Sequence, residues 1–181
     1  HPYAKTNILA EQKLKKLSNK SNKTNFIILR ISNAFGYPIT TKSNSWSLLL
    51  NDMVRNLVKN KYFKINSAGN QKRDFISVTE LCNIINFIIK KKSKNTKNYN
   101  VFNASSGVSM TIREVSFKIK KFLESIINEK LRIEFEQKKV QKNSLNFKLS
   151  NKKLIKYGYN FKISFNSEIK KLYLFCKKNK I

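Results

Sequence analysis

Short apolar runs alternate with segments of helical periodicity along this chain, and this alternation is what most limits its fold. Residues 4–17 place Ile8, Leu14 and Leu17 on an apolar stripe, which predicts a helix. The run at 26–29 is apolar without interruption, a pattern typical of a parallel strand that is buried on both faces. Strands that alternate with helices in this way predict an α/β fold.

The rest of the chain continues the same alternation. A turn-rich segment spans 32–44, and Thr111 with Glu114 has the spacing of a capping box at the start of a helix. We expect further helices at 46–59, 79–92, from 111 onward, 151–157 and 167–177, and further strands at 62–65, 75–78, 99–102 and 131–135.

The charge of the chain is unusual. Its 181 residues are 40% hydrophobic, which excludes wholesale disorder, yet 38 Lys and Arg against 10 Asp and Glu give a formal net charge of +28. Such a field favours polyanions, nucleic acid above all. Arginine supplies five of these cations, however, and no basic block is interleaved with stacking aromatics. We therefore favour a bias toward Lys at tolerant surface positions over nucleic-acid binding.

Membrane, redox and metal signals are weak. The longest apolar stretch, 81–89, is too short to span a bilayer. Cys82 and Cys176 lie far apart and predict reduced thiols of a cytoplasmic protein. His1, the one histidine, has no metal-ligand spacing to other residues, so we expect no metal site.

Three groups of motif residues follow one another in a fixed order. The first group lies on one face of the first helix, the second follows the buried strand, and the third leads into the strand at 75–78. They are Tyr3, Asn7 and Glu11; Arg30, Asn33 and Gly36; and Arg73, Asp74, Phe75 and Ile76.

This order of motifs resembles the C-terminal part of the extended short-chain dehydrogenase/reductases, the NAD-dependent nucleotide-sugar epimerases and dehydratases. The resemblance implies the C-terminal portion of a Rossmann-type parallel sheet plus a smaller substrate-binding α/β part. Residues 1–35 would end the dinucleotide-binding domain, 36–181 would be mainly substrate-binding, and 99–104 would return to the sheet. With four glycines and no G-x-G-x-x-G, the chain lacks the phosphate loop, so we interpret it as a piece of a longer protein.

The resemblance also assigns roles to individual residues. Tyr3 and Asn7 stand at the catalytic positions and, with Ile31 and Ser32, would contact the NAD or NADP cofactor. Asn33 and Arg73 would bind the nucleotide-sugar substrate. Two simpler interpretations stay open: Asn33 could cap the turn before Gly36, and Arg73 could form a surface ion pair with Asp74 or Glu80.

The chain departs from the family at one position. Where the family has a lysine four residues after the catalytic tyrosine, this chain has Asn7, and Lys5 points away from that face. A free tyrosine titrates near pH 10 and is a poor base unless a nearby cation stabilises its phenolate. Activity therefore depends on whether the protein tolerates the loss of this charge.

The resemblance implies NAD(P)-dependent epimerisation, dehydration or reduction of a nucleotide-activated sugar, as in surface-polysaccharide synthesis. It is compatible with a homodimer, and we expect the 181-residue piece alone to be inactive. The alternative is a basic, non-catalytic module that binds nucleic acid or another polyanion, for which the charge and Asn7 both argue.

Overall fold

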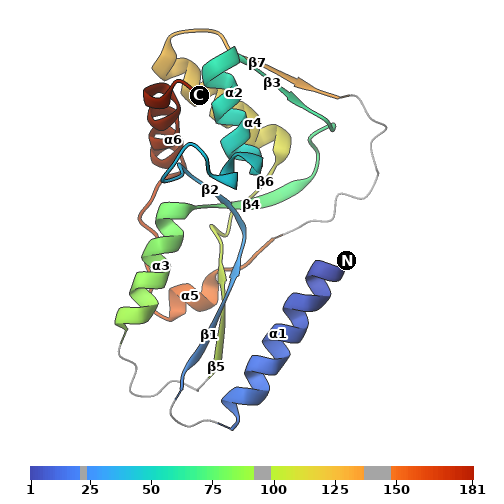
Figure 1. Cartoon of the computed structure of the whole chain (residues 1–181), viewed down its shortest axis with the longest axis vertical. Helices are drawn as coiled ribbons and strands as arrows, with labels where there is room; N and C mark the ends of the chain where they lie inside the picture. Colours follow the sequence, from blue (N-terminus) through green and yellow to red (C-terminus); the bar gives the residue numbers. More distant parts are fainter. Residues whose placement is uncertain (21–23, 92–98, 137–147) are drawn as a thin grey trace.

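A computed structural model of the chain describes residues 1–20, 24–91, 99–136 and 148–181. Helices and short parallel strands alternate along it, as the sequence predicts (Figure 1). In chain order the elements are α1 Pro2–Ser18, β1 Phe26–Ile31, β2 Asn33–Phe35, the 3-10 helix η1 Asn44–Ser47, α2 Leu49–Asn60, β3 Tyr62–Ile65, β4 Lys72–Ser77, α3 Val78–Lys90, β5 Tyr99–Ala104, β6 Ser109–Thr111, α4 Ile112–Ile127, β7 Arg132–Phe135, α5 Lys152–Lys156 and α6 Phe165–Asn179.

The long central pair of strands is parallel. β1 and β5 pair over their whole length, from Phe26 opposite Tyr99 to Ile31 opposite Ala104. α1 runs beside β1 in the opposite direction, and α3 lies on the other side of the pair (Figure 1). The prediction that β1 is buried on both faces is wrong, because Ile27 and Ile31 are 36% and 51% exposed. Within the described residues β5 is the one strand beside β1, so its other edge is uncovered.

β1 continues directly into a second sheet. β2 pairs in parallel with β4, and β4 pairs in antiparallel fashion with β6. β2 falls inside the segment predicted to consist of turns, so that prediction is wrong for residues 33–35. Three residues are too few to show strand periodicity. β2 is a strand because it pairs with the edge of β4.

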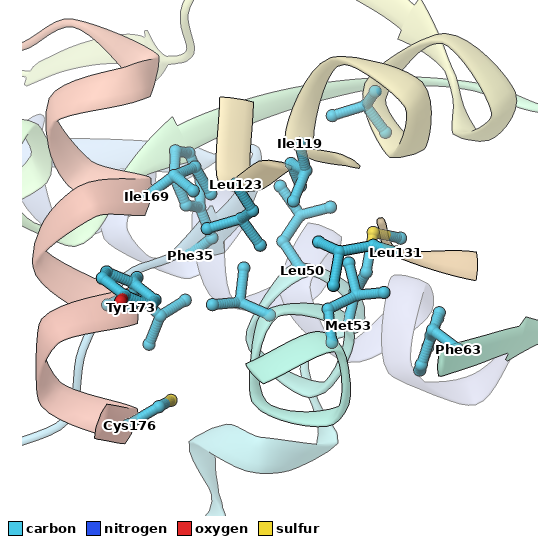
Figure 2. Close-up of a cluster of buried hydrophobic side chains, with 14 of the residues drawn as sticks. Phe35, Leu50, Met53, Phe63, Ile119, Leu123, Leu131, Ile169, Tyr173 and Cys176 are labelled. Atoms are coloured by element: carbon cyan, nitrogen blue, oxygen red, sulfur yellow. The ribbon is translucent and has the colours of Figure 1, made fainter. Parts of the chain in front are cut away.

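The largest hydrophobic core lies between α2, α4 and α6 and the two small sheets (Figure 2). The helices contribute a full stripe of buried side chains each, and β3 pairs in parallel with β7 at one end. The predicted capping box at Thr111 and Glu114 is confirmed, with both reciprocal bonds formed. Residues shown in Figure 2 include Phe35, Leu50, Met53, Phe63, Ile119, Leu123, Leu131, Ile169, Tyr173 and Cys176.

The predicted elements are confirmed in type, with ends that shift by a few residues. The helix predicted at 79–92 begins one residue earlier, and in the structure it extends as far as Lys90. The end predicted near Lys92 lies outside the described residues. Cys82 is exposed and Cys176 is buried, and both are free thiols. Among the helices that the structure describes, none has the length and apolar character needed to cross a bilayer.

Candidate functional site

A cavity of about 200 Å³ opens beside β2 and β4, where the sheet meets the start of α2. Two of the predicted site residues, Asn33 from β2 and Arg73 from β4, line it together. They are 40 positions apart in the sequence, and the parallel pairing of β2 with β4 brings them to one wall. The cavity lining is completed by Ala34, Ser47, Leu48, Leu49, Leu50 and Phe75.

Asn33 and Arg73 are held differently. The Asn33 side-chain amide donates to the backbone oxygen of Asp74 at 2.9 Å, which ties β2 to β4. The Arg73 guanidinium donates to Oε1 of Gln71 at 3.0 Å at an exposed position. Asn33 is thus a rigid part of the wall, whereas Arg73 is a charged side chain at the surface of the cavity.

The surface ion pairs considered for Arg73 are not formed, because both carboxylates are buried and bonded elsewhere. Asp74 accepts from the backbone N–H and the hydroxyl of Ser106, each at 2.9 Å, and is fully buried. Glu80 accepts from the Tyr159 hydroxyl and from the backbone N–H groups of 162 and 163. Asp74 therefore anchors the loop between β5 and β6, and Arg73 keeps its charge available to the cavity.

The turn around Gly36 is fixed by a side chain from α2. Asn51 accepts from the Gly36 N–H at 3.0 Å and donates to its C=O at 2.9 Å. Gly36 has φ +150°, and a Cβ there would lie 2.6 Å from Oε1 of the buried Glu168. Glycine is required because side-chain atoms fill the adjacent space. The turn that follows Asn33 is thus held by the core and is not capped by Asn33 itself.

The residues predicted for catalysis lie away from this cavity, on α1. Tyr3 is 75% exposed, and the side-chain amide of Asn7 donates to the Tyr3 backbone oxygen at 2.9 Å. The first turn of α1 lies toward the carboxyl end of β1, because the two elements run in opposite directions (Figure 1). Neither residue lines the cavity, so the structure does not join all predicted site residues in one pocket.

Two further motif residues bind each other. Arg30 of β1 donates to both carboxylate oxygens of Glu11 on α1, at 2.9 and 2.6 Å. The bond to the Arg30 guanidinium holds the pKa of the Glu11 carboxyl below its usual range. The ion pair fixes α1 to β1. The sequence spacing of Glu11 and Arg30 did not predict this contact.

Ile31 and Ser32, the predicted cofactor contacts, end β1. Ile31 is half exposed, and the Ser32 N–H donates to the C=O of Ala104 at 3.0 Å. The Ser32 hydroxyl is buried with no hydrogen-bond partner in the described protein. A buried hydroxyl without a partner is uncommon in a folded protein.

Sequence reasoning missed the second wall of the cavity. Ser47 ends η1, Leu48 lies between η1 and α2, and Leu49 begins α2. The sequence signal was a serine- and asparagine-rich stretch at 43–47 just before a helix, where Ser43 caps η1 by accepting from the Ser45 N–H. Such a stretch marks a helix start but gives no reason to place it opposite Arg73.

Chemically, the cavity offers one cation, one amide and an apolar floor. A planar guanidinium suits bidentate contact with phosphate oxygens, and the leucines provide an apolar surface. Its volume is below that of a site for a whole drug-sized ligand, so it can hold part of a larger molecule. In the part of the chain that the structure describes, no three His, Cys, Asp or Glu side chains are grouped as metal ligands.

Comparison with known proteins identifies the family. Residues 1–103 match the model of the NAD dependent epimerase/dehydratase family, which is more than half of the chain. The chain therefore belongs to this family, and the resemblance inferred from its motifs is confirmed. A comparison with curated proteins gives no significant match.

Solved structures agree on the fold. The chain is similar to a UDP-N-acetylglucosamine 4-epimerase from Methanobrevibacter ruminantium, with 19% identity over 99% of this chain and a TM-score of 0.76. It is also similar to a UDP-glucose 4-epimerase from Thermotoga maritima (16% identity, 99% of this chain, TM-score 0.76) and to RMD from Pseudomonas aeruginosa complexed with NADPH (17%, 98%, 0.76).

The chain spans 54% to 56% of the length of these three structures. The predicted fold class, a C-terminal portion of a Rossmann-type parallel sheet with a smaller α/β part, is confirmed.

Proposed function

We propose that the protein carrying this chain catalyses NAD(P)-dependent epimerisation, dehydration or reduction of a nucleotide-activated sugar, and that this chain supplies the substrate side. The observation that carries the proposal is the cavity that Asn33 and Arg73 line together. The relatives support the substrate class, since two of them are UDP-sugar 4-epimerases. Surface-polysaccharide synthesis in the cytoplasm, by a homodimer, is the setting we infer.

The proposed division of labour follows the sheets. Residues 1–35 would end the dinucleotide-binding part, and 99–104 would belong to the same sheet, which the parallel pairing of β5 with β1 supports. Most of 36–181 would form the substrate side around β2, β4 and the helical core. Ligands of open parallel sheets bind beyond the carboxyl ends of strands, and β1 ends next to β2.

On the substrate side, Arg73 would bind the diphosphate of the nucleotide sugar. Its guanidinium belongs to a half-buried residue and is not committed to Asp74 or Glu80, so it can turn toward phosphate oxygens. Asn33 would position the sugar or phosphate from the rigid wall that it forms with Asp74. Because the leucines of α2 exclude water beside them, both polar contacts would be strengthened.

On the cofactor side, this chain would supply one wall. When bound, NAD(P) accepts or donates a hydride. The unpartnered Ser32 hydroxyl and the half-exposed Ile31 fit the nicotinamide end, and Asn7 fits a ribose hydroxyl. Tyr3 would move a proton at a sugar hydroxyl, with the phenol oxygen as the acid or base. The pyrophosphate would need a glycine-rich loop that this sequence does not contain, so the 181-residue chain alone should bind NAD(P) weakly and be inactive.

The test is binding of UDP-glucose, used as a probe nucleotide sugar, measured by calorimetry on the chain and two variants. Arg73→Ala should weaken binding by about 1.5–3 kcal/mol, the range for a lost charge-assisted contact. Arg132→Ala is the matched control, since Arg132 is 75% exposed and lies on β7 away from the cavity. Equal weakening by both substitutions would mean that general charge, and not the cavity, binds the probe.

A second candidate function is the binding of nucleic acid or another polyanion. The small number of acidic residues favours it. All ten have a partner within the chain, and Lys and Arg outnumber them by 28, so most surface lysines have no acidic residue to offset them. Binding to generic DNA or RNA that falls steeply with salt would support this function. Protection by UDP-glucose in a thermal melt would instead support the enzyme.

A further inference from the structure

The first turn of α2 contains an asparagine that is bonded across to the segment after β2. Asn51 is the third residue of α2 and is fully buried. Its side-chain oxygen accepts from the Gly36 N–H at 3.0 Å, and its side-chain nitrogen donates to the Gly36 C=O at 2.9 Å. Among the side-chain hydrogen bonds of the described residues, these two are the ones that join α2 to this segment. They fix both distance and direction between the two backbones, because hydrogen bonds weaken steeply when they are misaligned.

This pair of bonds lies where the two walls of the cavity meet. The β2–β4 wall consists of Asn33, Ala34, Arg73 and Phe75, and the α2 wall consists of Ser47, Leu48, Leu49 and Leu50. Gly36 directly follows β2, and Asn51 directly follows the last residue of the α2 wall. The β2–β4 wall has its own bond, from the Asn33 side-chain amide to the Asp74 backbone oxygen. Asn51 therefore determines where the α2 wall stands relative to the β2–β4 wall.

The far side of Gly36 is closed by α6 and α3. A Cβ at Gly36 would lie 2.6 Å from Oε1 of Glu168 and 3.2 Å from Cβ of Val78. Glu168 is 1% exposed, and its Oε1 accepts from the Thr79 hydroxyl at 3.0 Å. The Gly36 backbone is thus held between this buried carboxylate and the Asn51 amide, so it cannot follow α2 if α2 shifts.

Apolar packing fixes the first turn of α2 less closely than these bonds do. The N-cap of α2 is Leu48, whose side chain cannot accept from the first-turn N–H groups as Ser, Thr, Asp or Asn would. Leu48 is 37% exposed, whereas Leu50 is buried in the helical core. Hydrophobic burial is non-directional, so it holds the helix in the core without setting the exact position of its first turn. Asn51 supplies the directional contact that the N-cap lacks.

We propose that Asn51 is a positioning residue of the nucleotide-sugar site: it sets the spacing between the α2 wall and the β2–β4 wall, and with it the affinity for a ligand that contacts both. This inference rests on the proposed function of the cavity. The lining residues that the structure describes do not include Asn51, so it acts through the leucines that precede it. A buried site keeps its geometry only when the groups that carry it are themselves locked by packing and hydrogen bonds.

The experiment compares two probes by calorimetry on the 181-residue chain. UDP-glucose is large enough to contact both walls, whereas inorganic pyrophosphate offers only the charge that Arg73 would bind. Asn51→Ala should weaken UDP-glucose binding about tenfold, since misplacing a positioning group by about 1 Å costs up to about 100-fold. It should leave pyrophosphate affinity unchanged. Arg73→Ala should weaken binding of both probes, because both carry the phosphates.

A matched control separates positioning from a loss of stability. Leu123→Ala removes a fully buried side chain from the same helical core and should destabilise the fold, yet it should leave the affinity for both probes unchanged. Asn51→Asp serves if Asn51→Ala does not fold, because it has the same shape and keeps the acceptor for the Gly36 N–H. It loses the donor to the Gly36 C=O and should also weaken UDP-glucose binding selectively. Circular dichroism melts verify that each variant is folded at the temperature of the titration.

The outcomes distinguish this inference from the proposed function. No UDP-glucose binding by the parent chain, or binding that Arg73→Ala leaves intact, would overturn both. If Arg73→Ala weakens binding while folded Asn51 variants bind UDP-glucose as the parent does, the positioning role alone is excluded. Equal weakening of both probes by Asn51→Ala, or weakening of UDP-glucose binding by Leu123→Ala to the same degree, would reduce Asn51 to a residue that only stabilises the fold.

Discussion

The two halves of the proposed site differ in how the chain itself supports them. Around β2, β4 and α2, side chains are buried and their polar groups are bonded: Asp74 is fully buried and Asn51 holds both backbone groups of Gly36. Along α1 and β1, apolar side chains such as Leu9 and Leu17 are more than half exposed. Glu11 with Arg30 is the main polar link between these two elements.

The two halves therefore differ in what they need to keep their geometry. The substrate half is a cavity wall that the chain builds from its own core, so its geometry should persist in the isolated chain. The cofactor half presents an exposed helix and an uncovered strand edge, so its geometry depends on what packs against them. The predictions below test this difference, beginning with Tyr3, the residue that the exposed half is proposed to contribute to chemistry.

Tyr3→Phe should lower turnover by about 10²–10⁴-fold in a preparation of the protein that converts a nucleotide sugar, because it removes the oxygen that we propose transfers the proton. Asn7→Lys should lower the pH at which turnover rises by about 1–3 units, since an ammonium four residues along the helix favours a phenolate. Rate–pH profiles of the parent and both variants measure this.

Thr6→Lys is the control for added charge, because position 6 is not on the face that Tyr3 and Asn7 share. It should leave the pH profile unchanged. Full activity in Tyr3→Phe would exclude Tyr3 as the proton carrier, and equal shifts from both lysines would mean that charge acts without geometry.

Leu123→Ala should lower the free energy of unfolding by about 2–5 kcal/mol, because Leu123 is fully buried between α2, α4 and α6 (Figure 2). Leu9→Ala on α1 should change it by less than about 0.5 kcal/mol, because Leu9 is 58% exposed. Urea unfolding of both variants gives the two values. Similar losses from both would show that α1 packs as tightly as the core.

The same contrast explains which features could be predicted from the sequence. The capping box at Thr111 and the apolar run that forms β1 depend on neighbours in the chain, and local pattern was sufficient for both. β2 and the burial of β1 depend on strands and helices far along the chain, and both predictions were wrong. Three residues in β2 carry no periodicity, and an apolar run does not reveal which elements cover it.

The residues of the site were likewise predictable where a local motif marks them, and not where packing decides the contact. Family motifs gave Asn33 and Arg73, and the structure places both at one cavity. Motifs did not reveal that Asp74 anchors Ser106 or that Leu48 and Leu49 close the cavity, because those contacts arise from packing. The assignments of Tyr3, Asn7, Ile31 and Ser32 stay predictions.

Between pH 9 and 11 the helical core should lose stability through Cys176. Burial raises the pKa of this thiol from 9.0 to about 11, with the nearby Arg55 opposing the effect. The unfolded chain then releases this proton at a lower pH than the folded chain, so the free energy of unfolding falls as pH rises across that range. The loss should reach about 2–3 kcal/mol.

Cys176→Ala is the comparison, because it removes the titrating group. Its unfolding free energy will start lower at neutral pH, owing to the cavity, but should decline less between pH 9 and 11. Denaturant unfolding at several alkaline pH values measures both slopes. Parallel declines in the two proteins would assign the alkaline loss to other groups, such as Tyr159, whose pKa burial also raises.

The smallest effect is expected where the two halves are joined, at Glu11 and Arg30. The lowered pKa of Glu11 means that the folded chain favours the carboxylate, so the pair stabilises the attachment of α1 above the ordinary value of 4.5. This contribution is lost as pH falls through the lowered pKa. Because Arg30 is 58% exposed, the pair should be worth no more than about 1 kcal/mol.

Glu11→Gln should therefore speed hydrogen exchange along α1 at pH 7 and leave exchange in α2 unchanged. Glu129→Gln is the control, because it breaks the more exposed pair with Lys61 and should affect neither helix. Equal protection of α1 in the parent and in Glu11→Gln would show that apolar packing, and not this ion pair, holds α1 on β1.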